Sequence, residues 1–155
     1  MSEIQRRVGA ESWHIAIAVA QFNPDITGML LEGTRQTLDQ AGVAEGQVEV
    51  FEVPGAWELP LACQQLVACG RFDAVIALGA VVRGETAHFD FISAECAQGL
   101  QRVSLDSGVP VAFGVLTPEN GEQAIERADP KRKNKGREVA EAALDMIALK
   151  ARVAS

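Results

Sequence analysis

The feature that most constrains this chain is a regular alternation of short apolar runs with longer segments of helical periodicity. Four runs have the length and the apolar, β-branched character of buried strands, and they cover 14–21, 48–54, 73–82 and 109–116. The first three helical segments each end near a glycine, the residue that most readily terminates a helix. Strands that alternate with helices imply right-handed crossovers and a parallel sheet.

The pattern therefore predicts an α/β fold, a flavodoxin-like three-layer α/β/α sandwich with a four-stranded parallel core sheet. The predicted helices cover 24–41, 57–69, 88–106, 122–128 and 135–152. Asn23 followed by Pro24 is typical of a helix start, because asparagine caps the first amides and proline suits the first turn. For a chain of 155 residues we expect a single domain over 1–155 that opens with an extended segment at 1–13.

The overall charge and the cysteines disfavour several classes of protein. A net charge of −7 argues against general nucleic-acid binding, and no run approaches the roughly 18 apolar residues of a membrane span. The first residues lack the apolar run of a signal peptide. Cys63, Cys69 and Cys96 have neither the number nor the spacing of a disulfide framework or a metal site. The sequence thus favours a cytoplasmic protein with no nucleic-acid or membrane partner.

Six basic residues lie within eleven positions of this acidic chain. They are Arg127, Lys131, Arg132, Lys133, Lys135 and Arg137. A local positive patch of this size suits a small anion better than a polyanion. For each side chain taken alone, a solvated position in a turn is the alternative interpretation.

Polar and aromatic side chains follow the predicted strands. In a sheet of this kind, ligands bind where the carboxyl ends of the strands meet. The loops that meet there are 21–23, 54–58, 82–88 and 116–117. They carry the rings of Phe22 and Trp57, although only 5% of the residues are aromatic, and also the side chains of Glu58, Thr86 and His88. The sequence therefore predicts a ligand site at this edge, with plain connecting loops as the alternative.

The stretch Arg83-Gly84-Glu85-Thr86-Ala87-His88 supports two interpretations. In the first, Gly84 lets the backbone approach a ligand, free amides at the helix start bind an anion, and His88 moves protons near neutral pH. In the second, Glu85 and Thr86 only cap the helix, and His88 covers its first turn. The spacing by itself does not decide between them, because a Gly-x-Thr loop is far less specific than a P-loop.

Six segments together carry a more specific signal than any single loop. They are Phe22-Asn23, VPGAWELP (53–60), GAVVRGETAHFDFI (79–92), VPVAFGVLT (109–117), EQAIERA (122–128) and NKG (134–136). In their order and spacing, from about Ile15 to Met146, they closely resemble the 6,7-dimethyl-8-ribityllumazine synthase family. The resemblance implies a flavodoxin-like enzyme of riboflavin biosynthesis. Such an enzyme condenses 5-amino-6-(D-ribitylamino)uracil with 3,4-dihydroxy-2-butanone 4-phosphate, releases phosphate and water, and uses no cofactor and no metal.

The resemblance also implies roles for the matching residues. Phe22 would stack on the pyrimidine ring, and His88 would carry protons. Further contacts to the pyrimidine and its ribityl chain would come from Ala56, Trp57, Glu58, Ala80, Val81, Val82 and, from a neighbouring chain, Phe113. The phosphate would be bound by Gly84, Glu85, Thr86 and Arg127, with Lys135 as an electrostatic support. A flavin-binding module without catalysis is the alternative, but such a module needs neither the phosphate residues nor the histidine.

The resemblance further implies a homopentamer, and the last predicted helix agrees with self-association. Its apolar surface is unusually broad and comprises Val139, Ala142, Ala143, Leu144, Met146, Ile147, Ala148, Leu149, Ala151 and Val153. The stretch 129–133 departs from the family, in which a glycine-containing turn helps twelve pentamers to pack into an icosahedral shell. Whether this chain forms that shell stays open. Riboflavin synthase is a further partner that the family suggests.

Overall fold

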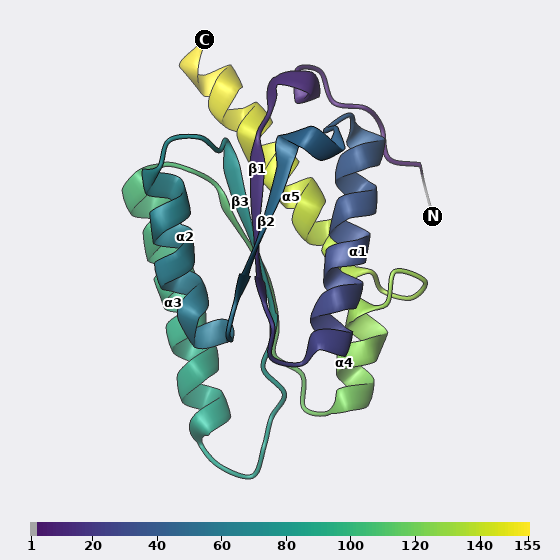
Figure 1. Cartoon of the computed structure of the whole chain (residues 1–155), viewed down its shortest axis with the longest axis vertical. Helices are drawn as coiled ribbons and strands as arrows, with labels where there is room; N and C mark the ends of the chain where they lie inside the picture. The colour runs from purple at the N-terminus through teal and green to yellow at the C-terminus, as the bar shows by residue number, and fades with distance from the viewer. Residues whose placement is uncertain (1–2) are drawn as a thin grey trace.

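The protein is described here by a computed structural model, which covers residues 3–155. Its centre is a sheet of four parallel strands in the order β2-β1-β3-β4. The strands are β1 (Ile15–Ala20), β2 (Val48–Val53), β3 (Ala74–Ala80) and β4 (Val111–Leu116). Helices cover both faces of the sheet, with α2 and α3 on one side and α1, α4 and α5 on the other (Figure 1). The predicted α/β sandwich with a four-stranded parallel sheet is therefore confirmed.

The helices follow the predicted alternation closely. They are α1 (Pro24–Ala41), α2 (Leu59–Ala68), α3 (His88–Ser107), α4 (Gly121–Ala128) and α5 (Lys135–Ala154). Three short 3-10 turns are added, η1 (Ala10–Ser12), η2 (Glu45–Gln47) and η3 (Ala56–Glu58). The helix predicted from residue 57 thus begins as the turn η3 and becomes α-helical only at Leu59, where Pro60 takes the second position of its first turn.

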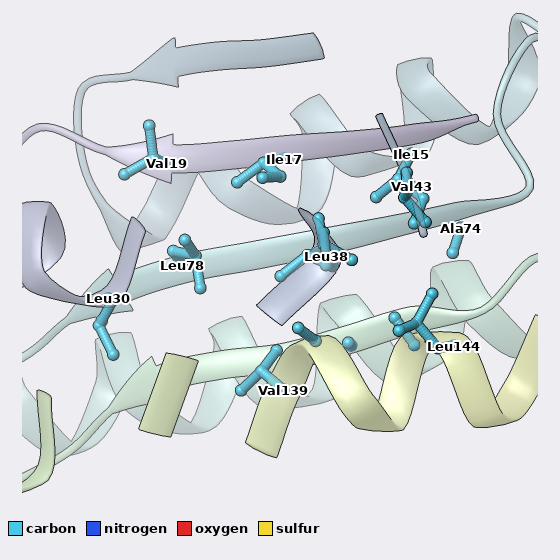
Figure 2. Close-up of a cluster of buried hydrophobic side chains, with 14 of the residues drawn as sticks. Ile15, Ile17, Val19, Leu30, Leu38, Val43, Ala74, Leu78, Val139 and Leu144 are labelled. Carbon is cyan, nitrogen blue, oxygen red and sulfur yellow. The ribbon is translucent and has the colours of Figure 1, made fainter. Parts of the chain in front are cut away.

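The two faces of the sheet bury different kinds of side chain. Along β1 the branched residues Ile15, Ile17 and Val19 point toward α1 and α5, as Figure 2 shows for their side chains. The intervening alanines of β1 belong to the second cluster, under α2 and α3. Successive side chains of a strand alternate between the two faces of the sheet. The large residues on one face and the alanines on the other therefore set different distances between the sheet and the helices that cover each face.

The helices α1 and α5 pack at very short range. A Cβ atom placed on Gly136 would lie 2.4 Å from the Leu30 carbonyl oxygen and 2.9 Å from the Thr34 nitrogen, so no larger residue fits without moving a helix. On the same face of α5, Val139, Ala143 and Ile147 are buried against the core. The close approach fixes the start of α5, including Lys135, relative to the sheet.

Asn23 stands at the predicted start of α1 but does not cap the helix with its side chain. Its backbone is left-handed, with φ at 61°, and its side-chain amide turns away to the end of β3. The backbone carbonyl oxygen of Asn23 accepts the amides of Ile26 and Thr27 instead. The predicted helix start is thus in the right place, but the capping role assigned to the side chain is wrong, because the bond of the side-chain NH2 group to Ala80 turns the side chain away from the helix.

The N-terminal segment docks on the rest of the fold. The Arg7 amide donates to the Ala41 carbonyl oxygen at 2.8 Å, and the Arg7 side chain pairs with Asp145 of α5. Of the predicted extended segment 1–13, residues 1–2 lie outside the described residues and residues 10–12 form η1. Within residues 3–155, no helix is both long and apolar enough to cross a lipid bilayer.

Candidate active site

The carboxyl ends of the strands, at the lower end of the view in Figure 1, gather most of the predicted site. The chain leaves β1 toward β2 on one side and leaves β3 toward β4 on the other. The point between β1 and β3 is therefore the switch point of the sheet, where connections diverge and leave a crevice. Figure 1 also shows that the C-terminal end of α5 lies at the opposite end of the molecule, away from this crevice.

A cavity of about 430 Å³ opens at the switch point, and we name it the aromatic cavity. It is lined by Phe22, Asn23, Pro54, Gly55, Ala56, Trp57, Glu58, Ala80, Val81, Val82, Gly84, Thr86, His88, Phe89 and Ile92. Phe22 is 72% exposed and Trp57 is 57% exposed in the single chain, which is unusual for rings of this size. Two large exposed rings over a cavity indicate a surface for a flat ligand.

The backbone that carries Phe22 is held from both sides. The Phe22 amide donates to the Pro54 carbonyl oxygen at 3.1 Å, which continues the β1–β2 ladder. On the other side the Asn23 side-chain amide donates to the Ala80 carbonyl oxygen at 3.0 Å and bridges the switch point. The Phe22 ring is therefore exposed, but its backbone is tied to both neighbouring strands.

Trp57 and Glu58 stand in η3, directly after a glycine. A Cβ atom placed on Gly55 would lie 3.5 Å from Glu58 Oε1 and 3.9 Å from Phe22 Cβ, so the carboxylate and the aromatic residue flank the same backbone position. Ala56 is buried and forms part of the cavity floor. The segment thus offers one acceptor group beside an aromatic surface, as a ligand with a ring and a hydroxylated chain requires.

Successive backbone amides after β3 point in opposite directions. The Val81 amide donates to the Leu116 carbonyl oxygen at 2.8 Å, and the Arg83 amide donates to the Pro118 carbonyl oxygen at 3.0 Å. Because both amides point to the β4 side, the Val82 amide between them points to the other side, where the aromatic cavity lies. The Val82 amide can therefore donate to a ligand in the aromatic cavity, whereas the Val81 amide and the Ala80 carbonyl oxygen already bond within the chain.

The loop 83–87 ends at His88, the first residue of α3. The Thr86 hydroxyl oxygen accepts the His88 amide at 3.3 Å and so satisfies the first amide of α3, although the N-cap residue itself is Ala87. A hydroxyl that accepts one hydrogen bond still has a proton to donate, and the capping interpretation does not exclude an anion site. Gly84, Thr86 and His88 line the aromatic cavity, whereas Glu85 is exposed to solvent and does not line it.

Three predicted site residues lie elsewhere. Phe113, Arg127 and Lys135 line a second cavity of about 630 Å³, beside the edge strand β4 and the helices α4 and α5. We name it the charged cavity, since its lining is Phe113, Val115, Leu116, Thr117, Pro118, Glu119, Gln123, Arg127, Lys133, Lys135 and Glu138. Arg127 donates to the Gln123 carbonyl oxygen at 3.2 Å, and Lys135 lies 3.9 Å from the Glu138 carboxylate. The structure thus divides the predicted site between two cavities of one chain.

Five lining residues of the aromatic cavity were given no site role from the sequence, namely Asn23, Pro54, Gly55, Phe89 and Ile92. Phe89 and Ile92 follow His88 on the first turns of α3, and helical spacing from the histidine would have indicated Ile92. No local pattern indicates the side-chain bond of Asn23 to Ala80, because the two residues are 57 positions apart.

Neither the acidic residues nor the cysteines suggest a metal centre. Among residues 3–155, no three His, Cys, Asp or Glu side chains lie together as a metal site requires. Burial raises the pKa of the Cys63 thiol to about 12, and the nearby Cys96 adds to the rise. Burial also raises the pKa of Cys96 to about 11, so both thiols stay protonated and unreactive near neutral pH.

The chain is similar to known proteins over nearly its whole length. A family model described as 6,7-dimethyl-8-ribityllumazine synthase matches residues 12–151. The 6,7-dimethyl-8-ribityllumazine synthase of Edwardsiella ictaluri (strain 93-146) is 52% identical to this chain over 148 residues. That alignment covers 95% of this chain and 95% of the relative. The match therefore includes both cavities and every loop between them.

Proposed function

This chain belongs to the 6,7-dimethyl-8-ribityllumazine synthase family, and from that premise we propose how its two cavities divide the reaction. The family supplies the activity, which is lumazine synthase activity in riboflavin biosynthesis. The proposal concerns the residues. The aromatic cavity of one chain binds the pyrimidine and moves the protons, and the charged cavity of a second chain closes the site.

The pyrimidine fits the aromatic cavity by its shape and its donors. The Phe22 ring stacks on the pyrimidine, and stacking of aromatic rings adds about 0.5–1.5 kcal/mol to the burial of apolar surface. Trp57 encloses the ring and the ribityl chain, and the Glu58 carboxylate accepts from the ribityl hydroxyls. The backbone from Ala80 to Val82 supplies the hydrogen bonds that fix the orientation of the pyrimidine.

The phosphate of the second substrate lies at the start of α3. Gly84, Glu85 and Thr86 offer backbone amides and a hydroxyl there, and the helix dipole favours an anion. The dipole alone stabilises an anion only weakly, by about 0.3–1 kcal/mol at an exposed position, so a full positive charge is also needed. Arg127 supplies that charge, and Lys135 beside it raises the local positive potential.

The chemistry needs no nucleophile from the protein. The amine of the pyrimidine attacks the ketone and forms an imine with loss of water. Phosphate elimination, tautomerisation and ring closure with loss of a second water follow, and all of them require proton transfers between partners that are held in place. His88 carries those protons, and the two cavities hold the substrates at reacting distance.

The division of the site supports assembly of identical chains, for which the family resemblance implies a homopentamer. Phe113, Arg127 and Lys135 line a different cavity from His88, so the residues of one site come together if each chain gives its charged cavity to a neighbour. Apolar side chains left exposed on the single chain add to this, among them Phe91 and Leu105 of α3 and Met146, Leu149 and Val153 of α5. We place the enzyme in the cytoplasm, which three free cysteines favour. An icosahedral shell and a complex with riboflavin synthase stay untested predictions.

The observation that carries this proposal is His88 at the rim of a cavity with two exposed aromatic rings. The test is to mix the purified protein with both substrates and to follow the lumazine by absorbance and fluorescence above the spontaneous reaction. His88→Ala should reduce the enzymatic rate about 10²-fold. If the variant keeps its rate, His88 is not the proton carrier. Tight flavin binding without any acceleration would instead favour the binding module.

A further inference from the structure

Arg83 is the most heavily bonded side chain of the loop that follows β3. Its Nε donates to Glu119 Oε2 at 2.8 Å, and its Nη2 donates to Asp90 Oδ1 at 3.3 Å. The guanidinium carbon lies 4.4 Å from the centre of the Phe89 ring. The Arg83 amide adds a backbone bond to the Pro118 carbonyl oxygen. Each ion pair joins partly exposed groups and contributes little by itself, but four contacts together restrict this residue more than a solvated loop arginine.

These contacts join three separate parts of the chain. Phe89 and Asp90 belong to the first turn of α3, directly after His88. Pro118 and Glu119 belong to the loop between β4 and α4 and line the charged cavity. Arg83 itself sits between Val82 and Gly84, which both line the aromatic cavity. The side chain therefore ties the loop 84–86, the turn of His88 and the wall of the charged cavity to one another.

The charges around Arg83 argue against a direct role in anion binding. Its guanidinium faces two carboxylates, those of Asp90 and Glu119, so the group of three carries a net negative charge. It lines neither cavity, although both of its neighbours in the chain line the aromatic cavity. A cation that is already paired twice offers little attraction to a phosphate, which must find its positive charge elsewhere.

We propose that Arg83 is a positioning residue, which fixes the phosphate loop 84–86 and the His88 turn against the β4–α4 loop. The inference rests on the assignment of the phosphate to that loop under the proposed function. Without Arg83 the loop gains conformations in which the amides and the Thr86 hydroxyl no longer converge. Binding of the phosphorylated substrate then has an added entropic cost of ordering the loop.

The experiment compares Arg83→Gln, Arg83→Lys and Glu119→Gln in steady-state kinetics with each substrate varied in turn. Inorganic phosphate serves as a second probe, as an inhibitor that competes with the phosphorylated substrate. We expect Arg83→Gln to raise KM for the butanone phosphate, and the inhibition constant of phosphate, by roughly five-fold. The KM for the pyrimidine should change less than two-fold, because Phe22 and Trp57 are tied to other strands.

The other two variants separate positioning from direct binding. Lysine keeps the charge but cannot form the fork that reaches both carboxylates, so Arg83→Lys should resemble Arg83→Gln. Glu119→Gln leaves Arg83 in place and removes one anchor, so it should also raise KM for the butanone phosphate, by roughly two-fold. Arg83 and Glu119 act through one contact. The double variant Arg83→Gln/Glu119→Gln should therefore raise KM for the butanone phosphate by less than the product of the two single effects.

Arg71→Gln is the matched control. Arg71 also pairs with a carboxylate, that of Glu49 at 3.1 Å, and lies 4.7 Å from the centre of the Phe72 ring. It precedes β3 and so stands at the opposite end of the sheet from both cavities. Loss of this pair should leave both KM values unchanged, which separates a local effect from a general loss of surface charge.

Three results would overturn the proposal. If Glu119→Gln lowers KM for the butanone phosphate while Arg83→Gln raises it, a freed Arg83 binds the phosphate directly. If Arg83→Lys retains wild-type KM values, the charge alone matters. If Arg83→Gln and Glu119→Gln both leave KM unchanged while Thr86→Val and Arg127→Ala raise it, Arg83 has no positioning role. Should these last two variants also leave KM unchanged, the phosphate assignment itself is wrong.

Discussion

The aromatic cavity and the charged cavity both lie near the carboxyl ends of the strands, yet the side chains that line them differ in chemistry. The aromatic cavity has two exposed rings, an apolar floor and one histidine, and it opens at the switch point between two central strands. The charged cavity has three cations and two carboxylates and lies beside the edge strand β4. The first is suited to a flat ring, and the second to an anion.

The difference follows from the position of each cavity in the sheet. At the switch point, helices from both faces and two strand ends enclose a crevice, so apolar side chains can be placed there. At an edge strand one side is open, and charged side chains keep the surface soluble until a partner covers it. Under the proposed function, neither cavity alone is a complete site for a phosphorylated substrate and a pyrimidine. Complementary cavities on one chain are what a ring of identical chains requires.

The largest effect should come from mixing two inactive variants. His88→Ala damages the aromatic cavity and Arg127→Ala the charged cavity, and each should lower turnover at limiting substrate about 10²-fold. If the site lies between chains, a random equal mixture restores about a quarter of the wild-type activity, because half of the chains provide each intact cavity. The measurement is the rate after joint unfolding and refolding. A mixture no more active than the average of its components would mean that the His88 and Arg127 of one site belong to the same chain.

The two cavities should also separate the two substrates. Arg127→Ala should raise KM for the butanone phosphate by up to about 10²-fold, because a hydrogen bond between charged groups contributes about 1.5–3 kcal/mol. Trp57→Ala should instead raise KM for the pyrimidine several-fold, through lost contact with the ring. Steady-state kinetics with each substrate varied measures both effects.

The controls for this pair are Lys131→Ala and Leu61→Ala. Lys131 belongs to the same basic stretch but does not line the charged cavity, and Leu61 is exposed on α2 outside the aromatic cavity. Both variants should keep wild-type KM values. An equal effect of Arg127→Ala on both substrates would remove the distinction between the cavities.

A smaller effect should come from Phe113, an aromatic residue that lines the charged cavity. Its ring is 43% exposed in the single chain, and we expect it to contact the pyrimidine bound to a neighbour. Phe113→Ala should raise KM for the pyrimidine roughly five-fold and leave KM for the butanone phosphate unchanged. Ile125→Ala, which removes an exposed apolar side chain of α4, should change neither value. If Phe113→Ala affects only the phosphorylated substrate, its ring belongs to the anion site.

The smallest effect concerns the packed layer beneath the aromatic cavity, where Cys63 and Cys96 are buried. Burial raises the pKa of Cys63 to about 12 and that of Cys96 to about 11, from an ordinary value of 9.0. Well below pH 9 both thiols are protonated in the folded and in the unfolded state, so their titration does not change the free energy of unfolding. Above pH 9 the unfolded state loses protons that the folded state retains, and the free energy of unfolding falls as pH rises.

Urea unfolding at pH 8 and pH 10.5, in the presence of a reductant, measures this fall. At the higher pH Cys63 should account for about 1–2 kcal/mol of lost stability, which Cys63→Ala removes from the pH dependence. Cys69→Ala is the control, because Cys69 is exposed at the end of α2. An identical pH dependence in the wild type and Cys63→Ala would show that Cys63 titrates normally and that this layer is open to water.

Much of the fold could be predicted because its signals are local. The β1 run IAIAVA is a buried strand by composition alone, and glycine at residues 42 and 108 marks the ends of α1 and α3. The prediction that Asn23 caps α1 with its side chain failed because the preference of asparagine for a cap is weaker than a long-range bond to Ala80. Ten of the fifteen residues that line the aromatic cavity had been given a site role from the sequence, because most of them lie in or near the loops that follow β1, β2 and β3. Their roles stay predictions.

The sequence by itself determined the succession of strands and helices along the chain, the loops that follow the strands, and the family. Each of these is carried by short segments whose residues are close together in the chain. Only the tertiary structure decided that Arg127 and Phe113 share a cavity apart from His88, that Asn23 bridges β1 and β3, and that Arg83 joins Asp90 to Glu119. The physical reason is that periodicity fixes which face a side chain takes on its own element. Which side chains meet depends on the order and twist of the strands, and these emerge only when the whole sheet is packed.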